Sequence, residues 1–193
     1  MENEDTAKEA AELAKKFDAR AESADARGRP DGPRPCGDLD MRIGRDGTWF
    51  YHGSPIGRNR LVKLFARVLR RDSEGVYWLE TPAEKGRIEV DDAPFVAVEL
   101  TVSGVGEGQG LRFRTNLDDV LTADADHPIH VTFDQETGEP SPYIHVRDGL
   151  DALIARPVYY ELVALGEEET VEGERLYGVW SEGHFFALGT PET

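Results

Sequence analysis

Residues 41–53, MRIGRDGTWFYHG, decide the fold. Apolar and polar residues alternate on the way in, Asp46-Gly47 has the composition of a tight turn, and an aromatic stretch leads back. The pattern predicts a β-hairpin. The next segment, NRLVKLFARVLRR at 59–71, has apolar residues at helical spacing and Asn59 as an N-cap, so it predicts a helix.

The same order of elements returns in the second half of the chain. After the helix, strands are expected at 76–81, 87–90, 94–102 and 111–116. The second half is expected to hold a hairpin at 129–146, a short helix that begins at Asp148, a strand at 158–165 and a final hairpin at 176–188. Ile43 aligns with Ile129, and residues 76–78 align with 158–160. We therefore expect an α+β protein built from a duplicated unit of hairpin, helix and antiparallel sheet.

The predicted domain organisation has three parts. Residues 1–37 are an extension, with an Ala-rich helix over 4–26 and a Gly/Pro linker at 28–35. The first α+β repeat spans 38–118 and the second spans 119–193, and the two are expected to pack as small domains. An alternative is that two unrelated α+β segments resemble each other by chance.

Charge is distributed unevenly along the 193 residues. The 22 Lys and Arg against 38 Asp and Glu give a net charge of −16, which argues against whole-surface binding to nucleic acid or anionic lipid. Residues 41–71 nevertheless contain 8 bases and one acid. An anionic ligand is therefore expected only at a small local site.

Several classes of protein find no support in the sequence. Cys36 is the only cysteine, no apolar run approaches the length of a membrane span, and the N-terminus has no signal-peptide pattern. A cytoplasmic protein with no membrane segment is expected. No nucleophile, metal or nucleotide-loop motif occurs, so we expect neither a cofactor nor a metal, and the sequence leans away from an enzyme.

Candidate ligand-binding residues come from the two expected helix starts. Arg58 and Arg147 each precede one of them, where free N–H groups and a guanidinium favour phosphate or carboxylate. Cations, an amide and aromatic rings that suit a nucleotide complete the candidate site: Lys85, Arg114, Asn116, Trp49 and Tyr143. The alternative is that Arg58 and Arg147 each pair with a nearby acid and that the other residues are structural, with Trp49 and Tyr143 in hairpin cores.

Several long sequence segments, which follow one another in a fixed order, resemble those of a known family. Among them are CGDLDMRIGRDGTWFYHGSPIGR, TPAEKGRIEVDDAPFVAVEL and PYIHVRDGLDALIARPVYYELV. Over roughly residues 36–189 the chain resembles a bacterial family of unknown function, domain-of-unknown-function family 1285. The resemblance implies a duplicated core, a C-terminal half similar to a pleckstrin-homology fold, and a ligand site at the interface of the halves. It also implies a nucleotide-based ligand and a role in signal transduction, but no catalytic residue.

Three functions follow as expectations. The first is a non-enzymatic sensor or adaptor that binds a small anionic, nucleotide-like ligand between its halves. The second is a protein-interaction module whose basic helix, 59–71, docks an acidic protein partner. The third is a phosphoester hydrolase that uses Glu84, Asp91 or Asp92 as acid or base.

Overall fold

The computed structural model describes residues 8, 10–12, 15 and 33–191. It divides into two compact units, Met1–Pro94 and Phe95–Thr193. The division differs from the boundary at 118/119 expected from the sequence. The reason is that the strands between residues 95 and 122 belong to the same sheet as those after residue 129.

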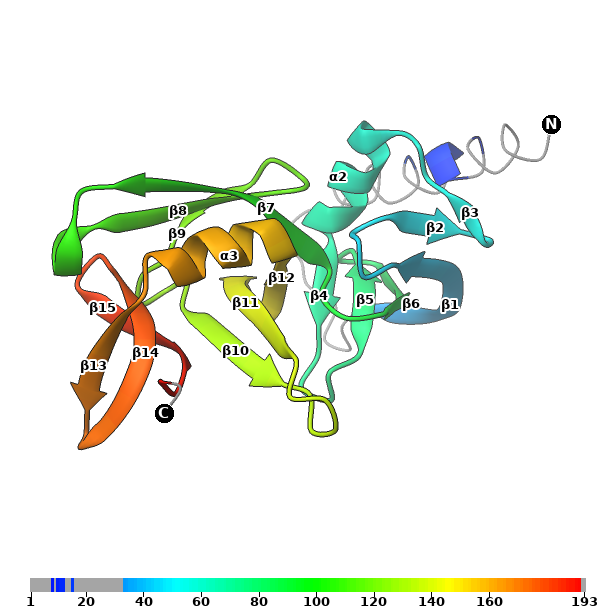
Figure 1. Cartoon of the computed structure of the whole chain (residues 1–193). Coiled ribbons are helices and arrows are strands. Elements are labelled where there is room, and N and C mark those ends of the chain that lie inside the picture. The colour runs from blue at the N-terminus through cyan, green and yellow to red at the C-terminus, as the bar shows by residue number, and fades with distance from the viewer. Residues whose placement is uncertain (1–7, 9, 13–14, 16–32, 192–193) are drawn as a thin grey trace. The chain divides into compact units, whose positions relative to one another are not determined.

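The first unit contains one six-stranded sheet and a helix (Figure 1). Its elements are β1 (Arg34–Ile43), β2 (Trp49–Tyr51), β3 (Ser54–Pro55), α2 (Asn59–Arg67), β4 (Leu69–Arg71), β5 (Tyr77–Glu80) and β6 (Glu84–Val90). The strand order is β3-β2-β1-β6-β5-β4. Strands β1 and β6 are parallel, and all other neighbours are antiparallel.

The predicted hairpin at 41–53 is confirmed as β1 and β2. Gly47 takes a φ of 80°, which glycine adopts without strain. The Asp46 carboxylate accepts hydrogen bonds from the main-chain N–H and the hydroxyl of Thr48. These bonds lower the pKa of Asp46 and fix the turn.

Helix α2 covers one face of this sheet. Phe65 stacks on Trp49 of β2 with ring centroids 6.2 Å apart, and both side chains are at most 1% exposed. The apolar side chains of the strands that face α2 are also buried: Met41, Ile43, Leu69, Leu79 and Ile88. This apolar layer is the core of the first unit.

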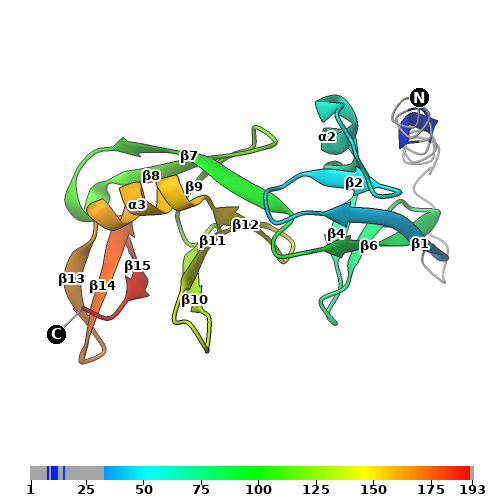
Figure 2. The same cartoon turned by 45° about the vertical axis from the view of Figure 1, so that its right-hand side comes forward.

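The second unit contains a six-stranded and a three-stranded sheet with one helix (Figure 2). Its strands are β7 (Phe95–Ser103), β8 (Gly110–Thr115), β9 (Val120–Thr122), β10 (Ile129–Phe133), β11 (Pro140–Arg147), β12 (Leu150–Ile154), β13 (Glu167–Val171), β14 (Glu174–Ser181) and β15 (His184–Gly189). The helix is α3 (Arg156–Ala164), and a 3-10 turn, η1, spans Gly106–Gly108. The large sheet has the order β10-β11-β12-β7-β8-β9, with β12 and β7 parallel.

The two six-stranded sheets share one topology, which supports the predicted duplication. Each sheet consists of two three-stranded meanders that follow each other in the chain. The first strand of the first meander pairs in parallel with the last strand of the second. The corresponding segments are residues 34–90 and 95–154. The expected alignment of Ile43 with Ile129 is therefore wrong, because Ile129 lies in β10, the counterpart of β4 rather than of β1.

Three expected elements differ in the structure. Asp148 does not cap a helix: Asp148 and Gly149, with φ of 46° and 73°, form the turn between β11 and β12. The expected strand at 158–165 is α3, which buries Val158 and Leu162, one helical turn apart. Helix α2 ends at Arg67, so the last three residues of the expected helix over 59–71 form β4.

The N-terminal predictions fall mostly outside the described residues. Within the expected helix over 4–26, only residues 8, 10–12 and 15 are described, and all are helical. Arg34 and Pro35 were expected in a linker but begin β1, opposite Glu84 and Lys85 of β6. Within the described part of the chain, no helix has the length and apolar character needed to cross a membrane. The likeness of the C-terminal half to a pleckstrin-homology fold stays a prediction.

The Asp148-Gly149 turn yields a stability prediction. A side chain at Gly149 meets no atom within 4 Å but must adopt a left-handed backbone, so Gly149→Ala should lower the free energy of unfolding by about 1 kcal/mol. Gly108 has equally open surroundings without a positive φ, so Gly108→Ala is the matched control and should change little. Urea unfolding measures both, and equal effects of the two substitutions would contradict a turn of this geometry.

Candidate functional site

Strand alternation gives the first sheet an outer face, on the side away from α2. Leu79 and Ile88 point into the core and are buried, whereas their neighbours Trp78 and Arg87 are half-buried and exposed. We define the outer-face cluster as Arg70, Trp78, Lys85 and Arg87. Its members come from β4, β5 and β6.

The register of the strands surrounds Trp78 with cations. Trp78 is the direct cross-strand partner of Arg70 on one side and of Arg87 on the other. Directly opposite residues have Cβ atoms about 5 Å apart, so all three side chains share one row. The Nζ atom of Lys85 lies 4.5 Å from the centroid of the Trp78 ring. Lys85 therefore lies over the indole, and two arginines occupy the strand positions on both sides of Trp78.

Asp72 holds the edge of the Trp78 ring. The indole Nε1–H donates to Asp72 Oδ2 at 2.8 Å, while the main-chain N–H groups of Glu74 and Val76 donate to Oδ1 at 3.0 and 2.9 Å. The hydrogen bond from Trp78 contributes most to lowering the pKa of Asp72 below its usual value, and the charge of Lys85 adds to the effect. The indole N–H thus has a hydrogen-bond acceptor, and this bond fixes the orientation of the ring.

Acidic residues limit the positive charge of this face to the neighbourhood of Trp78. Asp38 and Glu80 are the cross-strand partners of Arg87 and Lys85. Arg70 donates from Nη1 to the main-chain carbonyls of Leu69 and Arg67, which fixes its guanidinium beside β4. A ring held at its edge, with Lys85 over it and an arginine on each neighbouring strand, is suited to a planar ligand that also carries negative charge.

The predicted residues of the first unit have different surroundings. Lys85 belongs to the outer-face cluster. Trp49 is 1% exposed and packs on Phe65, so the core alternative applies and not the stacking role. Arg58 is exposed and is itself the N-cap of α2, where its main-chain carbonyl accepts from Leu61 at 2.9 Å. Asn59, the expected cap, is the first helical residue.

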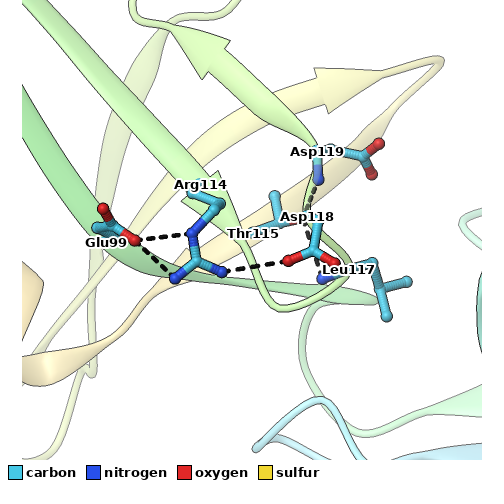
Figure 3. Close-up of polar contacts among 6 residues, drawn as sticks. All are labelled: Glu99, Arg114, Thr115, Leu117, Asp118 and Asp119. Atoms are coloured by element: carbon cyan, nitrogen blue, oxygen red, sulfur yellow. Dashed lines mark hydrogen bonds and ion pairs between the residues drawn. The ribbon is translucent and has the colours of Figure 1, made fainter. Parts of the chain in front are cut away.

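Arg114, in the second unit, has its charge neutralised by two carboxylates (Figure 3). Its Nε and Nη2 atoms lie 2.7 and 2.6 Å from Glu99 Oε2, and its Nη1 lies 3.3 Å from Asp118 Oδ1. The hydrogen bond and the charge of Glu99 raise the pKa of Arg114. This agrees with the structural alternative for Arg114, because an anionic ligand would have to displace both carboxylates.

The other predicted residues of the second unit make local contacts. Asn116 Oδ1 accepts from the main-chain N–H of Val96 at 3.0 Å, which joins two segments of the fold. The Arg147 guanidinium lies 5.2 Å from the Phe95 ring, and Tyr143 stacks on His130 with centroids 5.2 Å apart. Arg147 ends β11, so its expected place at a helix start is wrong. The convergence of Arg58 with Arg147 stays a prediction, since they belong to different units.

Sequence reasoning missed Trp78, Arg70 and Arg87. The available signal is that Trp78 and Arg87 each stand next to an apolar residue of an expected strand, Leu79 or Ile88, so that they point to the opposite face. Arg70 was assigned to the end of a helix, where a cation is equally favourable. Only the pairing of β4 with β5 brings Arg70 beside Trp78.

Comparisons with known proteins identify relatives along nearly the whole described chain. The model of the DUF1285 N-terminal domain, a domain of unknown function, matches residues 31–93, and that of the C-terminal domain matches 94–188. A crystal structure of a DUF1285 family protein from Silicibacter pomeroyi DSS-3 is 47% identical, covers 90% of this chain and 94% of its own, and has a TM-score of 0.76. Another, from Shewanella baltica OS155, is 25% identical, covers 66% and 91%, and has a TM-score of 0.50. No curated protein matches the chain.

The contact between Asp72 and Trp78 gives a spectroscopic prediction. Asp72→Ala removes the acceptor of the indole N–H, so the emission of Trp78 should shift to longer wavelength and lose anisotropy. The Trp78 signal is obtained by subtracting the fluorescence of the same protein with the additional substitution Trp78→Phe. Asp134→Ala is the matched control, because Asp134 also has a lowered pKa from turn hydrogen bonds but none from an indole. An unchanged Trp78 signal in Asp72→Ala would overturn this contact.

The same contact predicts an acid transition in the unaltered protein. Because the folded-state pKa of Asp72 is lowered, its ionised form stabilises the fold above the pKa of an unfolded Asp, about 3.9. This contribution is lost as the pH falls through the lower folded-state pKa. The Trp78 difference signal should therefore stay constant down to about pH 4 and change below it. A titration midpoint near neutral pH would contradict the assignment to Asp72.

Proposed function

We propose that this chain, which belongs to the DUF1285 family of unknown function, is a non-enzymatic binding protein for a small anionic ligand with an aromatic ring, such as a nucleotide. The observation that carries the proposal is the outer-face cluster, in which Lys85 lies over the Trp78 ring and Arg70 and Arg87 are the cross-strand neighbours of Trp78. The ligand ring stacks on the indole, and its phosphate or carboxylate contacts the cations.

Both the ring and the phosphate of such a ligand would interact favourably with the cluster. Stacking of a base on an aromatic side chain contributes about 1–3 kcal/mol, and a guanidinium group binds phosphate through two parallel hydrogen bonds. Lys85 lies over the indole. When a base displaces the ammonium group from the face of the ring, the positive charge of Lys85 stays beside the ring. The fixed indole reduces the entropy lost on binding.

The charge distribution favours the first unit for an anion. Residues 33–94 contain 10 acids and 11 bases, whereas residues 95–193 contain 19 acids and 5 bases. An anion therefore meets far less repulsion near the outer-face cluster than near the second unit.

Binding without catalysis agrees with the surroundings of the candidate acids and bases. Asp91 accepts from Arg42 at 2.5 Å, and Asp92 pairs with Arg45 at 3.1 Å, so these two carboxylates stabilise β1 and the turn that follows it. An acid or base role for Asp91 or Asp92 in a hydrolase would require one of these arginines to be displaced. A protein that binds a ligand without changing it suits a sensor or adaptor in signal transduction.

The proposal is tested by thermal shift with ATP, GTP, AMP, adenosine and inorganic phosphate. Nucleotides should raise the melting temperature, since a ligand that binds only the folded state stabilises it. Adenosine lacks the charge and phosphate lacks the ring, so each should act more weakly than AMP. Arg87→Ala and Trp78→Ala should weaken nucleotide binding about tenfold or more.

Arg112→Ala is the control for this experiment, because Arg112 is an exposed strand arginine of the second unit. It should leave the melting shift unchanged. No stabilisation by any nucleotide, or equal effects of Arg87→Ala and Arg112→Ala, would refute the outer-face cluster as the binding site.

A second candidate function is a protein-interaction module that uses α2. Arg60 and Arg67 are exposed on this helix and Lys63 is half-buried between them, which forms a basic stripe suited to an acidic partner. Charge reversal by Arg60→Glu and Arg67→Glu should abolish such docking but leave nucleotide binding at Trp78 intact. Retention of an acidic partner by the reversed helix would exclude this candidate.

A further inference from the structure

The second unit contains an open apolar groove that is separate from the outer-face cluster. Its volume is about 700 Å³. The lining residues come from β10, α3, β14, β15 and the residue after β15: Val131, Phe133, Tyr159, Val163, Leu176, Tyr177, Ala187, Leu188, Gly189 and Thr190. Burial raises the pKa of the Tyr159 hydroxyl, as expected for a phenol beside apolar side chains.

The helical wall of the groove is held in place by close contacts. The Tyr177 hydroxyl donates to the main-chain carbonyl of Val163 at 2.8 Å, which ties β14 to the end of α3. A Cβ atom at Gly166 would lie 2.4 Å from the Tyr177 ring, so the chain passes the ring with no room for a side chain. Tyr159 and Val163 are four residues apart and face the groove together.

The opposite wall exposes an aromatic side chain. Phe133 is 52% exposed and lies at the end of β10, next to Gly189 of β15, where a Cβ atom would be 3.7 Å from its ring. Strands β10 and β15 are edge strands of their sheets (Figure 2). The two edge strands contact each other, so Phe133 and the end of β15 form one wall of the groove.

Acidic residues dominate the surroundings of the groove. Residues 95–193 contain 19 acids and 5 bases. The two bases on the elements around the groove are already paired, Arg156 with Glu139 and Arg175 with Glu168. The electrostatic potential near the groove is therefore negative, which repels an acidic partner and attracts a basic one.

The geometry points to a docking site for an extended peptide segment of a partner protein, with apolar side chains in the groove and Lys or Arg on both sides of them. The apolar side chains bury Phe133 and extend the core between α3 and β15. The flanking cations neutralise the acidic surroundings. This site lies in a different unit from the ligand site proposed above and takes a different class of partner.

Fluorescence anisotropy with the full-length protein tests the site. The probe is a labelled decapeptide with alternating Leu and Ser at its centre and two Lys at each end. It should bind saturably, and more weakly as salt rises. Replacing its Lys by Glu, or its Leu by Ser, should weaken binding at least about tenfold.

Phe133→Glu should also weaken peptide binding at least about tenfold. Val120→Glu is the matched control, since Val120 is 50% exposed on another edge strand of the same sheet and does not line the groove. Both substitutions are at exposed positions, and circular dichroism checks that both proteins are folded.

Three results would overturn the proposal: no saturable binding, equal effects of Phe133→Glu and Val120→Glu, or equal affinity for the Glu-flanked peptide. Self-association that Phe133→Glu abolishes, measured by sedimentation velocity, would assign the groove to a second copy and overturn it as well. Nucleotide binding by Phe133→Glu should stay unchanged, so failure at this groove is distinguishable from failure at the outer-face cluster.

Discussion

The parallel pairing of β1 with β6 is the constraint on which the first unit depends. A chain that only formed meanders would leave its first and last strands at opposite edges of a sheet. Parallel pairing of those strands brings them to the centre instead, so β6 has neighbours on both sides. Arg87 of β6 then lies between Asp38 of β1 and Trp78 of β5, away from a fraying edge. The pairing of β7 with β12 repeats this arrangement in the second unit.

Helix α2 explains why the apolar side chains of the first sheet are buried on one face. It connects β3 and β4 at opposite edges of the sheet, and its Phe65 packs on Trp49 at the inner face. The buried apolar side chains of the first sheet therefore lie on the inner face. The other side accommodates the half-buried Trp78, whose cost of exposure is reduced by the stem and charge of Lys85. Trp49 thus belongs to the core, while Trp78 lies half-buried on the opposite face of the sheet.

The sequence predicts local elements well and their long-range pairing poorly. The hairpins at 41–53 and 176–188 are predictable because alternation and turn residues act within a few positions. Asp148-Gly149 was misassigned because Asp favours helix N-caps as well as tight turns. The strand at Leu69–Arg71 was hidden because its residues continue the apolar spacing of α2. The cluster around Trp78 needed strands β4, β5 and β6 to be paired, which no local pattern specifies.

The two proposed sites take ligands of opposite charge, so binding at one site would affect the affinity of the other. An anion at the first unit adds negative charge to a protein of net charge −16, and a basic peptide at the groove removes it. Opposite charges attract at every separation, so the electrostatic contribution to the coupling free energy favours simultaneous binding, and its size decreases with distance and salt. Thermodynamic linkage makes this coupling reciprocal. An adaptor that binds its partner more tightly when its ligand is present therefore needs no conformational change, only charges segregated between its two units.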